Sequence, residues 1–306
     1  MNSSTPVYKD IALSEYLGVD LYIKRDDLYP ISGGGSKGRK ADYILNTAVA
    51  NKHDSVVTCG GAQSNHVRAT AIKCRELGLE CTIVIHAPEP VVITGNYKIL
   101  IQLGVRIVHC EQKEVAKVMD REMLRFYERG LNPLYIWGGG HCIEGTRAYY
   151  EAVTELKEQL SLESLDFIVH ASGTGTTQAG LICGALNLYQ SCKVIGISVA
   201  RDKFRGQSAV YESVTVFCEE QNLSIPSLEV VDFQDEFNCG GYEKTNAELT
   251  ELINTVSKIS GLILDETYTG KAFLGLVENI KSGRIQKGDT VVFWHTGGLL
   301  NLLSVL

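Results

Sequence analysis

A lysine that closely follows a run of glycines is the residue of this chain with the clearest capacity for chemistry. Gly33–Gly35 form a flexible loop, and Lys37 stands at the start of the helix predicted after it. A lysine near a helix N-terminus and close to other cations has a lowered pKa, which suits an amine that forms a Schiff base. The Lys-Gly order does not match G-x-x-x-x-G-K-[ST], so the spacing excludes a nucleotide-binding loop of that type. The alternative is a solvated basic turn formed by Lys37, Arg39 and Lys40.

Polar residues also open the next predicted helix. Ser64, Asn65 and His66 follow Gly60–Gly61, directly after a run of buried-strand composition. Ser64 suits the N-cap of this helix, and a cap alone accounts for a serine at this place. The functional alternative puts the Asn65 amide on the phenolic oxygen of a cofactor and Ser64 beside the substrate.

A second glycine-rich turn has the composition of a phosphate-binding site. It lies between a predicted strand and a predicted helix, where backbone N–H groups and threonine hydroxyls converge on the positive end of the helix dipole. Its residues are Gly173, Thr174, Gly175, Thr176 and Thr177. A dinucleotide fingerprint G-x-G-x-x-G is weak here, because the sixth position is Gln178 and the next strand leads to Arg201 instead of an acidic residue.

The elements that must position these residues alternate along the chain. The predicted strands are Leu21–Lys24, Ser55–Cys59, Cys81–His86, Arg106–His109, Leu134–Trp137, Phe167–Ala171, Lys193–Val199, Leu228–Asp232 and Thr290–Trp294. The predicted helices between them are Ser64–Leu77, Glu114–Arg129, Glu144–Leu160, Thr176–Tyr189 and Glu243–Ser260. This alternation predicts an α/β fold with parallel sheets. Glycines cluster just after several strands, and the carboxyl ends of parallel strands are where such folds bind small molecules.

Composition excludes several other kinds of protein. The chain has 306 residues, enough for two packed units, with a net charge of −7 and a pI of about 5.6. No basic run with interleaved aromatics is present, so neither nucleic acid nor an anionic membrane is an expected partner. No apolar stretch has the ~18 residues needed to span a bilayer, and Met1–Asp10 does not resemble a signal peptide, so we expect a cytoplasmic protein. The nine cysteines are irregularly spaced, and neither disulfides nor a metal site is expected.

Taken together and in chain order, the motifs resemble those of fold-type II pyridoxal phosphate (PLP) enzymes. The match is best to the D-cysteine desulfhydrase and 1-aminocyclopropane-1-carboxylate (ACC) deaminase family, and it extends from Tyr22 to Gly298. Its most specific segments are Gly34–Lys40, Gln63–Arg68 and Tyr268–Ala272. The resemblance implies two open twisted sheets with flanking helices, as in the tryptophan synthase β subunit. Residues 1–40 and 151–306 would form a large domain and residues 41–150 a small one, with PLP between them in a homodimer.

The same resemblance implies a role for each motif. Lys37 would carry PLP as a Schiff base and then take the Cα proton of a small amino-acid substrate. Asn65 would bond the phenolic oxygen, the turn Gly173–Thr177 would hold the phosphate, and Ser64 would contact the substrate carboxylate. The residues expected beside the cofactor ring and the substrate are Tyr242, Tyr268 and Thr296.

Two positions divide the family and favour one reaction. Where ACC deaminases typically have Glu and Leu, this chain has Thr269 and Thr296. A carboxylate near the pyridine nitrogen would stabilise its protonated form, whereas a hydroxyl leaves it largely neutral. We therefore expect α,β-elimination, with D-cysteine as the best candidate, giving pyruvate, sulfide and ammonia. The alternatives are β-replacement, deamination of another small amino acid, and a catalytically silent PLP-binding protein.

Several residues depart from the family pattern near the expected site. They are Ser36, His141, Cys142, Glu243, Lys244 and Trp294. If they line the pocket, they predict a substrate other than D-cysteine; for Glu243 and Lys244, drift at a tolerant surface is the alternative.

Overall fold

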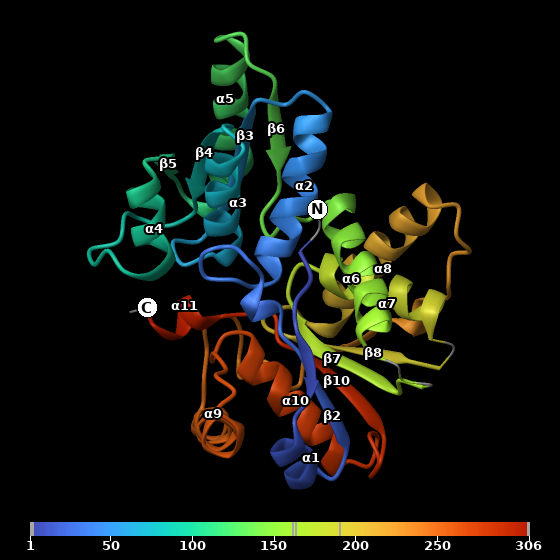
Figure 1. The fold of residues 1–306 in the computed structure, drawn as a ribbon. Helices are drawn as coiled ribbons and strands as arrows, with labels where there is room; N and C mark the ends of the chain where they lie inside the picture. Colours follow the sequence, from blue (N-terminus) through green and yellow to red (C-terminus); the bar gives the residue numbers. More distant parts are fainter. Residues whose placement is uncertain (1–2, 161, 163, 190, 305–306) are drawn as a thin grey trace.

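Two sheets flanked by helices make up the protein (Figure 1). The structure, a computed structural model, describes residues 3–160, 162, 164–189 and 191–304. The larger sheet runs in the order β1 (Val7–Lys9), β2 (Asp20–Lys24), β10 (Thr290–Trp294), β7 (Phe167–Ser172), β8 (Lys193–Ser198) and β9 (Asp232–Gln234). The smaller sheet runs in the order β5 (Arg106–His109), β4 (Glu80–Ile85), β3 (Ser55–Gly60) and β6 (Pro133–Ile136). Its strands all pair in parallel, as do those of the larger sheet except for β1, which pairs antiparallel with β2.

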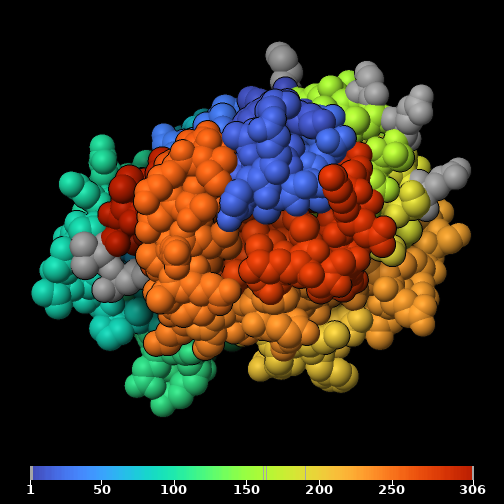
Figure 2. Space-filling view, turned by 90° about the horizontal axis from the view of Figure 1, so that it is seen from below, coloured from blue at the N-terminus to red at the C-terminus, as the bar shows by residue number. Residues whose placement is uncertain are grey.

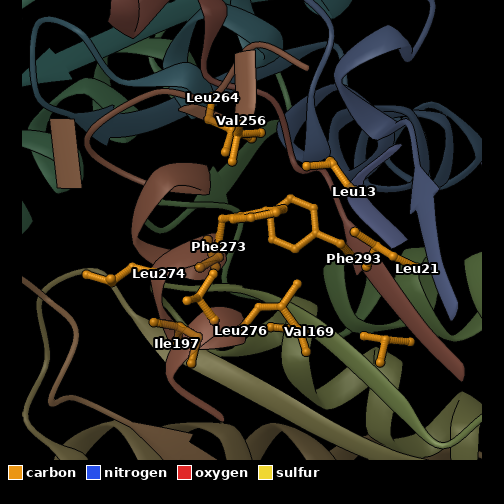
Figure 3. Close-up of a cluster of buried hydrophobic side chains, with 14 of the residues drawn as sticks. Leu13, Leu21, Val169, Ile197, Val256, Leu264, Phe273, Leu274, Leu276 and Phe293 are labelled. Carbon is orange, nitrogen blue, oxygen red and sulfur yellow. The ribbon is translucent and has the colours of Figure 1, made fainter. Parts of the chain in front are cut away.

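The larger sheet is covered by helices on both faces. Along β7 and β10 successive side chains point to opposite faces, so Ile168 and Val292 enter one core while Val169 and Phe293 enter the other. The first core contains α6 (Ile143–Gln159), α7 (Thr176–Leu188) and α8 (Lys203–Glu220). The second contains α1 (Ile11–Leu17), α9 (Ala247–Ser260) and α10 (Thr269–Lys281), and in it Phe273 meets Phe293 edge to face (Figure 3).

Segments far apart in sequence close this second face. The N-terminal segment, in blue, lies beside the orange and red C-terminal segments in the space-filling view (Figure 2). The contact between α1 and α9 accounts for part of this surface.

The smaller sheet also has helices on both faces, and one of them joins it to the rest of the molecule. α2 (Ser36–Ala50), α3 (Asn65–Glu76) and α4 (Gly95–Leu103) cover one face, and α5 (Val115–Tyr127) covers the other. α2 packs against both α3 and α6, so the helix that begins beside Lys37 touches both halves. The short α11 (Leu299–Leu302) packs near α4. The domain boundaries at residues 40 and 150 stay predictions.

Two of the sequence predictions are wrong. Residues 228–230 form a 3-10 helix, and the strand begins only at Asp232. The helix expected from Glu243 begins at Ala247, because the Asn246 side chain caps it by accepting from the Leu249 N–H at 2.8 Å. Glu243 lies in a turn with φ +58°, a conformation that a helix does not allow. No helix in the described ranges is long and apolar enough to cross a membrane.

Candidate active site

A cavity of about 550 Å³ lies between the part of the chain that contains the larger sheet and the part that contains the smaller sheet. It collects residues from the carboxyl ends of strands in both sheets, as the glycine pattern predicts. The expected site residues that line it are Lys37, Ser64, Asn65, Gly173, Thr174, Gly175, Thr177, Tyr242, Tyr268 and Thr296. Thr176 stands just behind this lining, where its hydroxyl accepts a hydrogen bond from Lys40.

Lys37 enters the cavity from the first turn of α2. Its Nζ donates to the Gly139 carbonyl at 3.0 Å, and no acidic side chain among the described residues pairs with it. Burial disfavours the charged form and lowers the pKa of Lys37 to about 8. A sizeable fraction of this amine is therefore neutral near physiological pH, and the neutral amine is the nucleophilic form.

The glycines before Lys37 are required by close backbone approach. Gly34 has φ +52°, and a Cβ at this position would lie 1.7 Å from the Asp27 carbonyl oxygen. Gly35 has φ +92°, and its N–H donates to the Asp26 carbonyl at 2.8 Å. The loop is thus fixed in one path, and Lys37 is held where α2 begins.

The interpretation of this segment as a solvated basic turn is wrong. Arg39 and Lys40 are each only 1% exposed. The Lys40 Nζ donates to the Thr176 hydroxyl at 2.6 Å, and burial together with Lys37 lowers the pKa of Lys40 well below its usual value. Lys40 is a site residue that the sequence analysis missed, although its i+3 spacing from Lys37 places both lysines on one helix face.

The turn before α7 has the features of an anion site. Gly175 precedes the helix with φ +110°, and the first N–H groups of α7 have no partner within the helix. The Thr174 hydroxyl is buried with no hydrogen-bond partner, and the Lys40 ammonium contacts the neighbouring Thr176. A phosphate group fits these donors, because it would supply the missing acceptor and the missing negative charge.

Ser64 and Asn65 lie at the N-terminus of α3 and line the cavity. Ser64 is the N-cap, and its hydroxyl accepts from the Val67 N–H at 3.5 Å, so the cap interpretation holds while the residue also lines the cavity. The Asn65 amide accepts from Asn96 at 2.9 Å and donates to Asn301 at 2.5 Å. His66 bonds the Thr58 hydroxyl at 2.8 Å and faces Lys37 and Lys40; burial and these cations lower its pKa to about 3, so it is neutral.

Two tyrosines that contact each other line the cavity. The hydroxyls of Tyr242 and Tyr268 are 2.6 Å apart, with their rings edge to face. Burial raises the pKa of Tyr242 to about 12, and burial together with Tyr242 raises that of Tyr268 further, so both phenols keep their protons. The buried Lys271 holds the loop before Tyr242 by donating to the Gly241 carbonyl at 2.6 Å.

Several expectations about the neighbourhood of the cavity are wrong. The Thr269 hydroxyl is bonded to the Asp265 carboxylate at 2.7 Å and accepts from the Asp265 N–H at 3.0 Å, and it does not line the cavity. Of the two threonines that divide the family, only Thr296 reaches the cavity. Trp294 is buried in the hydrophobic core that contains Ile168 and Val292, where its ring meets Tyr149 edge to face at 5.8 Å. Its side chain points into this core because it lies two residues after Val292 in β10, on the same face of the sheet.

The other residues that depart from the family pattern also lie outside the cavity lining, except for Ser36. Ser36 lines the cavity. His141 bonds the Thr174 carbonyl at 3.0 Å and so supports the anion site from behind, while Cys142 ends the loop before α6. Glu243 is exposed on its turn. Only the Ser36 departure therefore contacts the space that a substrate would enter.

Two arginines that the sequence analysis did not include among the site residues line the cavity. Arg68 is 1% exposed and donates to the carbonyls of Ser32 and Gly34, so α3 holds the lysine loop. Arg201 donates to the Thr174 carbonyl at 3.2 Å. Neither pairs with an acidic side chain in the part of the chain that the structure describes.

Comparison with known proteins agrees with this geometry. Residues 2–297 match the family model described as pyridoxal-phosphate dependent enzyme. A Thermotoga maritima protein provisionally named 1-aminocyclopropane-1-carboxylate deaminase is 36% identical over 306 residues, covering 98% of this chain and 95% of that protein. A D-cysteine desulfhydrase from Serratia proteamaculans is 31% identical over 310 residues, covering 97% and 92%.

A solved structure confirms the fold. The crystal structure of an ACC deaminase homologue matches with a TM-score of 0.88 at 32% identity, covering 99% of this chain and 94% of that one. The expectation of a fold-type II architecture is therefore correct.

Proposed function

Because this chain belongs to the family of pyridoxal-phosphate-dependent enzymes, we propose that it catalyses α,β-elimination on a small β-substituted amino acid. D-cysteine is the best candidate substrate, with pyruvate, sulfide and ammonia as products. The observation that carries the proposal is a single cavity in which a desolvated lysine amine faces a preformed anion site.

The residues of the cavity divide into those for the cofactor and those for the substrate. Lys37 would attach PLP, and the first-turn N–H groups of α7 with Thr174 and Lys40 would hold its phosphate. The Asn65 amide would donate to the phenolic oxygen. Thr296 would stand near the ring nitrogen, and Ser64 would bind the substrate carboxylate beside Tyr242 and Tyr268.

The lysine then serves a second purpose as a base. Bound PLP supplies an electron sink that stabilises negative charge at the substrate Cα. The Lys37 Nζ, freed when the substrate amino group takes its place, would accept the Cα proton, and its lowered pKa increases the fraction in the neutral form that this step needs. Tyr242 and Tyr268 remain protonated, so they can donate hydrogen bonds to the leaving group.

The choice of elimination over ACC ring opening depends on Thr296. An uncharged hydroxyl leaves the ring nitrogen largely neutral, which suits loss of a β-leaving group, where a carbanion need not persist. The Thr269 hydroxyl does not contribute to this argument, because Asp265 occupies it. The similar proteins include both deaminases and desulfhydrases, so they do not decide the substrate.

The test is pyruvate release from D-cysteine, L-cysteine and ACC by the PLP-loaded protein, with and without an added thiol. We expect release from D-cysteine, with ACC inert. A thioether product in the presence of thiol, at the expense of pyruvate, would establish β-replacement instead. Turnover of none of the three would overturn the proposed elimination. We also expect a homodimer, which light scattering would show, and a location in the cytoplasm.

A further inference from the structure

Four amide side chains, three of them buried, form a hydrogen-bonded cluster beside the cavity. Gln63 and Asn65 stand at the start of α3, Asn96 is in α4, and Asn301 is in α11. Asn96, Asn301 and Gln63 are 0%, 6% and 9% exposed. The cluster therefore joins the smaller half to the C-terminal segment, and Asn65 is the member that lines the cavity.

The orientation of three of these amides follows from backbone groups whose roles are fixed. The Gln63 carbonyl can only accept, and it contacts the Asn96 Nδ2 at 2.8 Å and the Asn301 Nδ2 at 3.1 Å. Both contacts require nitrogen, so neither amide can be flipped. The Gln63 side chain is fixed in the same way, because its Oε1 accepts from the Asn96 backbone N–H at 2.8 Å and its Nε2 donates to the Thr94 carbonyl at 3.1 Å.

These orientations determine which atom of Asn65 faces each neighbour. The Asn96 Nδ2 also donates to Asn65 at 2.9 Å, so the atom of Asn65 at that contact must be the oxygen. The Asn65 nitrogen then faces Asn301, whose oxygen accepts from it at 2.5 Å. One N–H of Asn65 remains, and it belongs to a side chain on the cavity wall.

This polarity leaves one atom of the cluster without a partner. The Asn96 Oδ1 is buried and makes no hydrogen bond in the part of the chain that the structure describes. A buried oxygen without a donor destabilises the fold. The arrangement therefore does not maximise hydrogen bonding within the cluster. It does fix which atom of the Asn65 amide is the oxygen and which is the nitrogen that donates.

We infer that Asn96 and Asn301 are positioning residues that fix the Asn65 amide so that it presents an N–H, and not an oxygen, to the cavity. The group recognised there is an oxygen acceptor, and the phenolic oxygen of PLP is one; this step depends on the proposed function. An N–H donated to that oxygen stabilises its negatively charged form. Reversal of the Asn65 amide would place its oxygen against the Asn301 oxygen, which is also an acceptor.

The test is the absorption spectrum of the bound cofactor in Asn96→Asp and Asn301→Ala proteins. In Asn96→Asp an acceptor replaces the donor, and Asn65 is driven to flip. We expect the ratio of visible to near-ultraviolet absorbance to fall and PLP affinity to drop by ~10-fold or more, since the lost bond is charge-assisted. Asn301→Ala should change both in the same direction but less, because Asn96 still holds the Asn65 oxygen.

A matched control separates positioning from general destabilisation. Asn279 is also a buried asparagine, and its Nδ2 donates to the Gln234 side chain and the Gly275 carbonyl, away from the cavity. Asn279→Ala should lower thermal stability without changing the spectrum. In an Asn65→Ala background, Asn301→Ala should have no further spectral effect.

Two failures can be told apart. If the unsubstituted protein shows no visible cofactor band that depends on Lys37, the proposed function is wrong. If that band is present and the spectra of both Asn96→Asp and Asn301→Ala equal it, the inference alone is overturned. Should Asn96→Asp fail to fold, Asn301→Ala and its cycle with Asn65→Ala decide.

Discussion

Two groups of cations lie at the first turns of α2, on different faces of the helix, and they differ in what surrounds them. Arg39 pairs with Asp26 at 2.8 Å and with Glu155 at 2.7 Å, and Lys24 contacts the same glutamate. Burial alone would raise the pKa of Asp26, but Arg39 and the hydroxyl of Tyr149 outweigh it and lower the pKa to about 2. Every charge in this group has an opposite charge beside it.

The second group has cations without such partners. Lys37 donates to a backbone carbonyl and Lys40 to a hydroxyl, neither pairs with a carboxylate among the described residues, and burial lowers the pKa of both. Breaking a buried ion pair strongly destabilises the fold. A buried lysine without an anionic partner loses its proton easily, which makes its amine reactive, and its charged form attracts a negatively charged ligand. The start of α2 thus contributes Arg39 to an ion-pair network that stabilises the fold, and Lys37 and Lys40 to the candidate active site.

The largest expected effect concerns activity. Lys37→Ala should lower turnover of D-cysteine by at least ~10²–10⁴-fold, the usual contribution of a proton-transfer group, and the attachment of PLP is lost as well. The free energy of unfolding of the PLP-free protein should not fall, because a desolvated amine is removed. Pyruvate assays and thermal unfolding check this, with Lys9→Ala, at a half-exposed lysine that pairs with Asp20, as control. Retained turnover in Lys37→Ala would remove this lysine from the mechanism.

The next effect concerns stability and has the opposite pattern. Arg39→Met leaves Asp26 and Glu155 with less compensation, and we expect a loss of ~3–5 kcal/mol in the free energy of unfolding. Denaturant titration of the PLP-free protein measures it. A loss below that of an ordinary surface substitution would mean that the network does not stabilise the fold.

Lys40→Met is the matched substitution on the other face. It removes a cation that has no carboxylate partner, so the free energy of unfolding without PLP should be unchanged or higher. PLP affinity should fall by ~10–100-fold, because one charge-assisted contact to the phosphate is lost. Titration of the PLP-free protein with PLP gives the affinity. Equal affinity in both proteins would place the phosphate away from Lys40.

The smallest effect is on pH dependence. Only the neutral amine attacks a carbonyl, and with a pKa of about 8 the neutral form of Lys37 is ~10% of the total at pH 7. The rate at which PLP attaches to the PLP-free protein should therefore rise about tenfold from pH 7 and level off above pH 8–9. A rate that keeps rising to pH 10 would show an ordinary lysine pKa.

Most of the fold could be predicted from the sequence, and the failures have local causes. Several parallel strands contain apolar, β-branched residues, and β5 and β10 were predicted to the residue. β9 is only three residues long, and the apolar residues before it form a 3-10 helix instead. The helices α4, α8 and α10 were not predicted, and of these α10 is buried nearly throughout.

The site was predictable where a motif carries it and not where tertiary contacts do. Lys37, Asn65 and the turn at Gly173–Thr177 stand in recognisable patterns. Lys40 contacts Thr176, which is 136 positions away along the chain, and Asn301 contacts Asn65, which is 236 positions away. No local spacing indicates such contacts. Trp294 was misplaced because it stands next to a motif yet points into the core.

The most direct test of the distinction between the two groups of cations is reductive trapping of the cofactor. The PLP-loaded protein is treated with borohydride, digested, and its peptides are mapped by mass spectrometry. A single pyridoxyl label on Lys37, with Lys24 and Lys40 unmodified, is the predicted result. A label on another lysine, or none, would contradict the assignment of this cavity as the PLP site.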